Sequence, residues 1–291
     1  MTPLVILGCG YIGTRLARTA VAAGRQVRAC ARGTGRMAPL ASEGIEVKYL
    51  DAEQPKLLNA ALASMRGGTL VYSIPPLQGP PPGDTVRRTL QAAAGAGIGC
   101  FIYLSSSGLY GDSPDDDVWI DDDTPIVLDD APMSAARANE GAIESSTFDV
   151  RTVTLRLAPV YGPGRGVRAR LRKGDYKLLD DGQHAISRIH VDDVVQVIFA
   201  AETTGAHGSR YLVADDEPTT QIEYATWLAN RMGVEMPGTR PALAPGKPRV
   251  AHRNRRIRNA RMKAELGVTL KYPTYREGEA AIEAEETPAT A

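Results

Sequence analysis

Residues 4–13 read LVILGCGYIG, an apolar run of strand length followed by a glycine pattern and the start of a helix. In this G-x-G-x-x-G pattern, Gly8 permits a tight turn, Gly10 lets the backbone approach a pyrophosphate, and Gly13 lets the helix pack on the strand. Backbone N–H groups at the helix N-terminus then face the anion. The pattern predicts a dinucleotide-binding βα unit, because a merely tight turn would not require three glycines at these spacings.

Apolar runs alternate with helical patterns through the first two thirds of the chain. This alternation is typical of βαβ units, so we predict an α/β fold, a Rossmann doubly wound parallel sheet with a smaller C-terminal lobe. The predicted strands are residues 4–7, 26–31, 45–49, 69–73, 100–104, 152–156 and 210–214. The predicted helices are residues 12–23, 54–65, 85–96, 134–144 and 193–202, with another beginning at Thr220.

The same patterns predict how the chain divides into domains. We expect a dinucleotide-binding domain over residues 1–165, completed by about residues 187–214. The substrate-binding lobe is expected to consist of residues 166–186 and 215–282. The last residues, 283–291, contain a proline and small side chains, and they are predicted to form a flexible tail.

Composition limits the classes of partner. The chain has 291 residues, and its 34 Lys and Arg balance 34 Asp and Glu, so no net field favours nucleic acid or an anionic membrane. We predict a small-molecule substrate, and a homodimer is left open. The first ten residues lack the basic region of a signal peptide, and glycines and serines interrupt the longest uncharged stretch, residues 89–111. A cytoplasmic protein without a membrane span is expected. The scattered cysteines and histidines predict no metal site and no disulfide framework.

Two segments carry opposite charge. Residues 112–130 hold nine aspartates and no Lys or Arg, whereas residues 247–263 hold eight Lys or Arg and no acid. Each is most simply a solvated surface. Alternatively, the two segments attract each other and close the C-terminal lobe over the cofactor domain. A nucleic-acid role is disfavoured, because no aromatic residues interleave with the arginines.

The end of the second predicted strand bears on the choice of cofactor. NAD-binding proteins usually place an acid there, which accepts hydrogen bonds from the ribose hydroxyls. Residues 28–32 read RACAR, which offers no carboxylate, and the guanidinium of Arg32 can pair with a 2'-phosphate. We therefore expect NADP(H) to be favoured over NAD(H). The alternative is that Arg32 is only a solvated loop residue.

Four stretches together carry a family resemblance: GCGYIG at 8–13, LSSSGLYG at 104–111, RLAPVYGPGR at 156–165 and RIHVDDV at 188–194. In that order they resemble the cofactor turn, the active-site serine segment, the sixth-strand motif and the returning motif of the extended short-chain dehydrogenase/reductase superfamily. That group includes nucleotide-sugar epimerases and dehydratases. The resemblance covers most of residues 1–215 and implies an NAD(P)-dependent oxidoreductase of the epimerase/dehydratase type.

Carried over by position, the resemblance implies roles for single residues. Ser106 fills the position of the active-site hydroxyl, with Ser107 as the alternative and Tyr110 as a third catalytic candidate. Asp51 resembles the acid that contacts adenine. The other implied cofactor contacts are Gly8, Gly10, Tyr11, Ile12, Gly13, Ile74 and Pro75, with Pro159 and Val160 near the nicotinamide. Structural interpretations remain open: Ser106 can satisfy backbone groups at a strand end, Asp51 can cap the next loop, and Tyr110 can pack under a loop.

The helix that would carry the catalytic pair departs from the family pattern. Members place a tyrosine four residues after a proline, a lysine four later and a glutamate four after that, on one helix face. With Pro132 and Glu144 as anchors, the tyrosine position is Ala136 and the lysine position is Glu140. The chain therefore resembles atypical members that keep the cofactor fold and lack the Tyr–Lys pair.

Proton transfer would then come from another group. Beyond the serine segment, the implied candidates are Asp121 or Asp122 and His184 or Arg188. Two functions stay open: an NAD(P)-dependent oxidoreductase acting on a small molecule, or a non-catalytic NADP(H)-binding sensor or scaffold. A redox-neutral lyase or isomerase is disfavoured.

Overall fold

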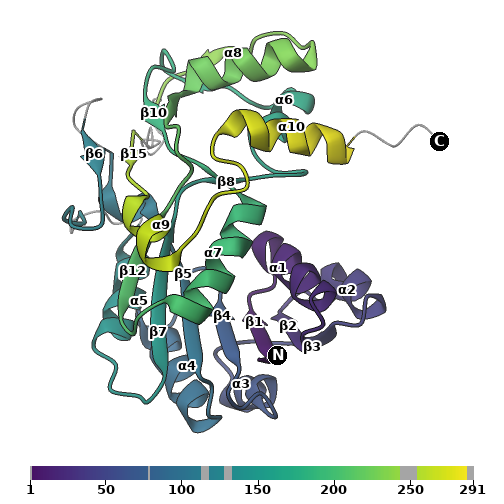
Figure 1. Cartoon of the computed structure of the whole chain (residues 1–291), viewed down its shortest axis with the longest axis vertical. Coiled ribbons are helices and arrows are strands. Elements are labelled where there is room, and N and C mark those ends of the chain that lie inside the picture. The colour runs from purple at the N-terminus through teal and green to yellow at the C-terminus, as the bar shows by residue number, and fades with distance from the viewer. Residues whose placement is uncertain (1, 78, 113–117, 128–132, 243–253, 287–291) are drawn as a thin grey trace.

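The computed structural model describes residues 2–77, 79–112, 118–127, 133–242 and 254–286 (Figure 1). Its central strands are β1 Leu4–Leu7, β2 Val27–Ala31, β3 Glu46–Tyr49, β4 Thr69–Tyr72, β5 Cys100–Ser106, β7 Arg151–Leu157 and β12 Ser209–Val213. They form one sheet in the order β12-β7-β5-β4-β1-β2-β3, and every neighbouring pair is parallel. The strand order reverses between β1 and β4, as expected of a doubly wound sheet. The predicted fold class is confirmed.

The inner strands β1 and β4 are buried along their whole length, which is why their residues form continuous apolar runs. Successive side chains point to opposite faces, so Leu4 belongs to one core cluster and Val5 to the other. The register aligns Leu7 with Cys30 of β2 and with Tyr72 of β4. The carboxyl ends of these strands therefore meet at one edge of the sheet, where the glycine turn leaves β1.

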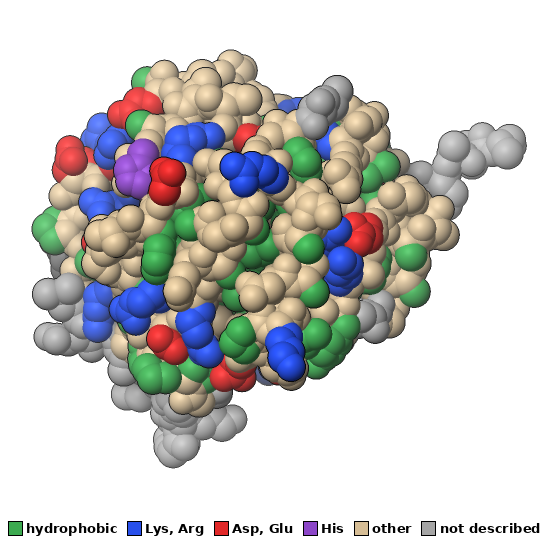
Figure 2. Space-filling model, turned by 90° about the horizontal axis from the view of Figure 1, so that it is seen from below, with side chains coloured by type: hydrophobic (Ala, Val, Ile, Leu, Met, Phe, Trp, Pro, Cys, Tyr) green, Lys and Arg blue, Asp and Glu red, His purple; other side chains and the backbone are tan. Residues whose placement is uncertain are grey.

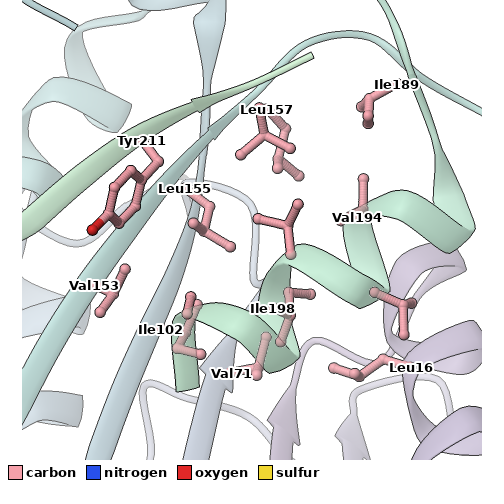
Figure 3. Close-up of a cluster of buried hydrophobic side chains, with 14 of the residues drawn as sticks. Leu16, Val71, Ile102, Val153, Leu155, Leu157, Ile189, Val194, Ile198 and Tyr211 are labelled. Carbon is pink, nitrogen blue, oxygen red and sulfur yellow. The ribbon is translucent and has the colours of Figure 1, made fainter. Parts of the chain in front are cut away.

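Helices cover both faces of the sheet. They are α1 Tyr11–Ala22, α2 Ala38–Ser42, α3 Pro55–Leu62, α4 Asp84–Gly95, α5 Ser134–Glu144, α7 Val191–Thr204 and α9 Ala260–Leu266. Side chains of α1, α7 and α9 join one core cluster, and those of α3, α4 and α5 join the other. Figure 3 shows the first cluster, in which Leu16 of α1 and Val194 and Ile198 of α7 lie against Ile102 and Leu155 of the sheet.

A second group of elements lies beyond the carboxyl edge of the sheet, at the top of Figure 1. Its helices are α6 Val167–Arg172, α8 Gln221–Met232 and α10 Tyr275–Glu286. Its strands pair as β8 Val160–Tyr161 with β11 Ile189–His190, β9 Leu178–Leu179 with β14 Thr239–Arg240, and β10 Ala185–Ile186 with β13 Thr219–Thr220. A small core that includes Tyr161, Tyr224, Leu228 and Tyr275 joins these elements.

The two oppositely charged segments meet in the structure. Strand β6 Trp119–Ile120 of the acidic segment pairs in parallel with β15 Arg256–Ile257 of the basic segment. The backbone N–H of Arg258 donates to the carbonyl of Ile120 at 2.8 Å, and its charge acts on nearby Asp121. The contact holds part of the C-terminal segment against the loop that follows β5. Residues 113–117 and 243–253 of these segments lie outside the described residues.

The flexible tail is predicted to start at residue 283, which lies near the end of helix α10. Helix α10 continues to Glu286, because its last acidic side chains are held by arginines of other elements. Glu283 pairs with Arg231, and Glu285 pairs with Arg15 of α1. Residues 287–291 lie outside the described residues.

The opposite end of the molecule, away from the carboxyl edge of the sheet, is shown in Figure 2. Basic and acidic side chains are interspersed over this face in small groups, in keeping with the equal numbers of the two charges in the sequence. Among the helices that the structure describes, none has both the length and the apolar character needed to cross a membrane.

Candidate functional site

The turn between β1 and α1 is built tightly around two glycines. Gly8 has a φ of +89°, and a Cβ there would lie 2.6 Å from the backbone carbonyl carbon of Ser73. A Cβ at Gly13 would lie 3.0 Å from Cγ2 of Ile6, so this glycine lets α1 rest on β1. Any larger residue at Gly8 would force the turn away from the end of β4. The two glycines have the roles that the sequence predicts for them.

Gly10 differs from the other two glycines, because the space beside it is open. A Cβ built there would meet only the carbonyl oxygen of Gly8, at 3.9 Å. The residue directly precedes α1, whose first N–H groups have no intrahelical acceptor. The N–H groups of Gly8 and Cys9 both donate to the carbonyl of Cys30, which fixes the turn to β2. The turn therefore offers an exposed helix N-terminus that a phosphate can approach closely.

A groove of about 800 Å³ runs from this turn across the ends of β2 and β3. Its lining includes the following predicted cofactor contacts: Gly8, Gly10, Tyr11, Ile12, Arg32, Asp51, Ile74 and Pro75. The remaining predicted glycine, Gly13, lies behind the turn, against β1. Residues from four separate parts of the sequence thus come together along one groove. Its shape and donor groups fit a dinucleotide, with the open space at Gly10 where the pyrophosphate would lie.

The two side chains expected to select the nucleotide both line this groove. Arg32 is exposed and follows directly after β2. The carboxylate of Asp51 accepts from the N–H of Glu53 at 3.1 Å and from Nε2 of Gln54 at 3.0 Å. Asp51 therefore also caps the following loop, as its structural interpretation predicts, while its side chain stays at the wall of the groove.

A second cleft, of about 840 Å³, continues from the groove along the carboxyl ends of β5 and β7. The two cavities share Ile12, Ser73 and Arg165. The predicted residues Ser106, Ser107, Pro159 and Val160 all line the second cleft. The cleft lies next to the point where the strand order reverses, which is where ligands bind in open α/β sheets.

The serine segment presents its three hydroxyls differently. Ser106 ends β5, and its Oγ accepts from the N–H of Gly108 at 3.0 Å at the start of a short 3-10 helix, Ser107–Tyr110. A hydroxyl that accepts one hydrogen bond can still donate its own hydrogen to a ligand. Ser107 is almost fully buried at the wall of the cleft. Ser105 donates instead to the carboxylate of Glu140, within the protein.

Tyr110 lies behind the cleft. It is 5 % exposed, and its hydroxyl accepts from Nη1 of Arg156 at 2.6 Å. Burial raises the pKa of Tyr110. The described residues that line the cleft do not include Tyr110. This placement favours the structural interpretation, in which the ring packs under the segment and its hydroxyl holds Arg156.

Helix α5 carries no Tyr–Lys pair, whichever of its positions are compared with the family pattern. Ala136 and Glu140 are both buried, and Glu140 forms an ion pair with Arg156 at 2.6 Å. The helix sequence contains neither tyrosine nor lysine, and the chain has no lysine between Lys56 and Lys173. Pro132, the anchor used in the sequence comparison, lies outside the described residues. The position that would hold a cation in the family pattern therefore holds a carboxylate, Glu140, which is bound to Arg156 and Ser105 inside the protein.

The two candidate proton donors of the acidic segment, Asp121 and Asp122, make hydrogen bonds within the protein. Asp121 accepts from the hydroxyl of Thr124, and Asp122 accepts from the N–H of Leu212 at 3.0 Å. Burial raises the pKa of Asp122. Neither residue belongs to the described lining of the cleft.

Two arginines that the sequence patterns did not single out line the cleft. Arg165 lines the nucleotide groove, the cleft and a third cavity, and its guanidinium lies 5.0 Å from the ring centre of Tyr11. Burial raises the pKa of Tyr11 to about 12, although the Arg165 charge opposes this shift. Arg255, at the edge of the basic segment, is 7 % exposed, and its Nη1 donates to the carbonyl of Gly111 at 2.7 Å. Arg165 is the last residue of the sixth-strand motif, and this position was the one feature of the sequence from which a place near the cleft could have been predicted.

The third cavity, of about 410 Å³, opens from Pro159, Val160 and Arg165 into the group of elements beyond the sheet. Arg188, one of the implied candidates, lines this cavity and is 4 % exposed. The third cavity shares Pro159, Val160 and Arg165 with the cleft, so it adjoins the cleft as the cleft adjoins the nucleotide groove, and Arg165 lines all three.

Comparison with known proteins agrees with this arrangement. The model of the NAD dependent epimerase/dehydratase family matches residues 4–214. A 3-diazoavenalumate denitrifying reductase from Streptomyces sp is 28 % identical, over 96 % of this chain and 99 % of that protein. A functionally unknown conserved protein from Silicibacter pomeroyi is 30 % identical, with a TM-score of 0.82 over 98 % of this chain and 99 % of that one. MoeE5, solved with UDP-glucose and NAD, shares the fold at 21 % identity, with a TM-score of 0.75 over 97 % of each chain. The family resemblance inferred from the sequence is confirmed.

Proposed function

The chain belongs to the NAD-dependent epimerase/dehydratase family, and from this premise we propose that it is an NAD(P)-dependent oxidoreductase that favours NADP(H). It transfers hydride to or from a small molecule held in the cleft beside Ser106 and Ser107, without the usual Tyr–Lys pair. One observation carries the proposal: the nucleotide groove and the serine-lined cleft adjoin each other, since Ile12, Ser73 and Arg165 line both. A substrate in the cleft would adjoin the end of a dinucleotide that lies in the groove.

The residues of the groove divide the work of holding the cofactor. The open backbone at Gly10 and the N-terminus of α1 receive the pyrophosphate. Asp51 contacts adenine, and Arg32 pairs with the 2'-phosphate of NADP(H), since no carboxylate stands at the end of β2. Pro159 and Val160 lie against the nicotinamide, which supplies or accepts the hydride when the cofactor is bound.

The hydroxyls at the end of β5 are the groups that would face the reacting atoms of the substrate. Ser106 accepts from Gly108 and keeps its own hydrogen for the substrate, and Ser107 stands next to it at the cleft wall. A serine without a cationic partner is a weak acid, so this site suits a reduction in which the hydroxyl stabilises developing charge by a hydrogen bond. One relative is named as a reductase, which favours net reduction of a substrate over epimerisation.

A non-catalytic NADP(H)-binding sensor is the second candidate. The absence of tyrosine and lysine from α5 favours it. Against it stands the cleft of about 840 Å³ with two serine hydroxyls on its wall, which a protein that only senses a nucleotide does not require.

The two candidates are separated by incubating the protein with NADPH and a panel of small carbonyl, imine and diazo compounds. The proposal predicts that NADPH fluorescence falls with at least one compound and that Ser106→Ala slows this turnover. Ser145→Ala is the matched control, because Ser145 is exposed at the end of α5, away from the cleft. Tight NADPH binding without turnover on any compound would favour the sensor.

A further inference from the structure

The third cavity has an unusual charge pattern. Five basic residues contribute to its lining: Arg165, Arg170, Lys177, Arg188 and Arg240. No aspartate or glutamate of the described chain shares that lining. Four of the five are exposed at the rim, whereas Arg188 is buried at 4 % exposure. The cavity therefore has a single cation in its buried part.

Arg188 lacks a fixed partner for its charge. Its Nη1 is buried without a hydrogen bond, and no carboxylate of the described chain lies within ion-pair distance of it. Its guanidinium lies instead over aromatic rings, 4.1 Å from the ring centre of Tyr224 and 5.3 Å from that of Tyr275. Asp215 and Glu279 attract it from beyond that distance. Glu279 is already paired with Arg168, and burial raises the pKa of Asp215 well above its usual range, which favours the neutral form of that carboxyl. A buried cation without a paired anion is costly, unless a ligand supplies the anion.

The neutral hydrogen-bonding groups beside Arg188 are largely engaged within the protein. The amide oxygen of Gln221 accepts from the N–H of Leu179 at 3.1 Å. The hydroxyl of Tyr224 donates to the carboxylate of Glu279. The hydroxyl of Tyr161 is the exception: it has no hydrogen-bond partner, but it is buried directly against Gly278. Few groups remain to recognise sugar hydroxyls or a base, whereas aliphatic side chains of the wall, such as Val167 and Ile186, are available to an apolar ligand.

We propose that this cavity binds the anionic end of the substrate, and that the substrate is a carboxylate on a planar, apolar body and not a sugar nucleotide. The proposal deepens the proposed function and rests on it. The carboxylate would accept a charge-assisted hydrogen bond from Arg188, and the flat body would lie against the aliphatic wall. Because the cavity opens at Pro159 and Val160, the far end of the substrate reaches the cleft beside Ser106.

Calorimetry on the NADPH-loaded protein tests the proposal with trans-cinnamate, a planar apolar carboxylate, and with its neutral amide. We expect the anion to bind about tenfold or more tightly than the amide, because only the anion makes a charge-assisted pair with Arg188. UDP-glucose, added as a third probe, should not displace cinnamate. Equal binding of anion and amide, or no binding of cinnamate, would overturn the proposal.

Two variants locate the anion site. Arg188→Gln should remove the preference for cinnamate over its amide, while the affinity for NADPH stays within about twofold. Arg188→Lys should retain part of this preference, since an ammonium keeps the charge but lacks the guanidinium fork. Arg172→Gln is the matched control: it lies on α6, is exposed, and is absent from the described lining of the cavity. Unchanged cinnamate binding in Arg188→Gln would refute the assignment.

The outcomes also separate this proposal from the one on which it rests. Failure of the parent protein to bind NADPH would contradict the proposed function. NADPH binding without cinnamate binding would contradict only the carboxylate pocket. If Arg188→Gln does not fold, as judged by its NADPH binding, the comparison of anion with amide in the parent protein still decides the matter.

Discussion

The glycine turn after β1 and the helix α5 both reach the carboxyl edge of the sheet, but the turn keeps the family pattern and the helix departs from it. In the turn, a Cβ at Gly8 would lie 2.6 Å from the backbone of Ser73, so the main chain itself allows no other residue. In α5, the position expected to hold lysine holds Glu140, buried against Arg156. In the proposed function the dinucleotide is recognised mainly by backbone geometry, which the fold keeps, whereas the catalytic pair of the family pattern depends on side chains, which the fold can replace.

The first prediction tests whether α5 still has room for the missing lysine. Glu140→Lys should lower the free energy of unfolding by about 3–5 kcal/mol, because it removes the partner of Arg156 and buries a second cation beside it. Chemical denaturation measures the change. Glu144→Lys is the control on the same helix: Glu144 is half exposed in a surface pair with Arg210, so this change should cost less than about 1 kcal/mol. A stable Glu140→Lys protein would mean that α5 can still accept the cation.

The second prediction tests whether the glycine turn is the phosphate site. Gly10→Val should weaken NADPH binding about a hundredfold or more, on the order of 3 kcal/mol, because the new side chain fills the open space at the start of α1. Circular dichroism should change little, since a Cβ at this position meets no atom closer than 3.9 Å.

Gly141→Ala provides the control for this variant. Gly141 lies on α5 with no atom within 4 Å of an added Cβ, and alanine should stabilise the helix without affecting the cofactor. If Gly10→Val titrates with NADPH as the parent protein does, the groove at this turn does not hold the pyrophosphate.

The third prediction separates the chemistry of the cleft from the binding of the nucleotide. Ser106→Ala should lower turnover on a reactive substrate about a hundredfold, because one positioned hydrogen-bond donor to a developing negative charge contributes on the order of 10²-fold or more. NADPH affinity should stay within about twofold, since the hydroxyl faces the cleft and not the groove. Steady-state rates and calorimetry measure the two effects. Full activity in Ser106→Ala would mean that the Ser106 hydroxyl is not needed for turnover, and Ser107 or a group of the substrate would then be the donor.

The sheet was predictable because its signals are local. All seven predicted strands lie in it, with boundaries that differ from those of the structure by at most two residues, as at β5, which continues to Ser106. Short apolar runs punctuated by glycines encode such strands in a few consecutive residues. The two-residue strands β6 and β15 left no such signal, because a bridge of this length has no periodicity.

Side-chain placement was harder to predict, because it depends on contacts between distant residues. Tyr110 lies four residues from Ser106, yet it turns away from the cleft to hold Arg156, 46 residues further along the chain. The places of Arg165 and Arg188 become visible only in the folded structure, in which Arg165 lines all three cavities and Arg188 lines the third. No spacing in the sequence shows that the Glu140 carboxylate is already paired inside the protein.

The last prediction concerns the side chain that we propose selects NADP(H) over NAD(H). Arg32 lines the groove, is exposed, and has no carboxylate beside it at the end of β2. A charge-assisted hydrogen bond to the 2'-phosphate is worth about 1.5–3 kcal/mol, so NADPH should bind the parent protein more tightly than NADH does. Arg32→Ala should weaken NADPH by about this amount, leave NADH nearly unchanged, and so bring the two affinities together in calorimetry.

Salt provides an independent check on this preference, because interactions at an exposed site are screened by ions. The preference for NADPH should shrink as the ionic strength rises in the parent protein, and it should vary much less with salt in Arg32→Ala. Arg87→Ala is the control, since Arg87 is exposed on α4 and is absent from the described lining of the groove. Equal affinities of the parent protein for NADPH and NADH would contradict the assignment to Arg32. The phosphate groups of the nucleotide would then be held by the backbone of the glycine turn without help from Arg32, which would sharpen the contrast between this turn and α5.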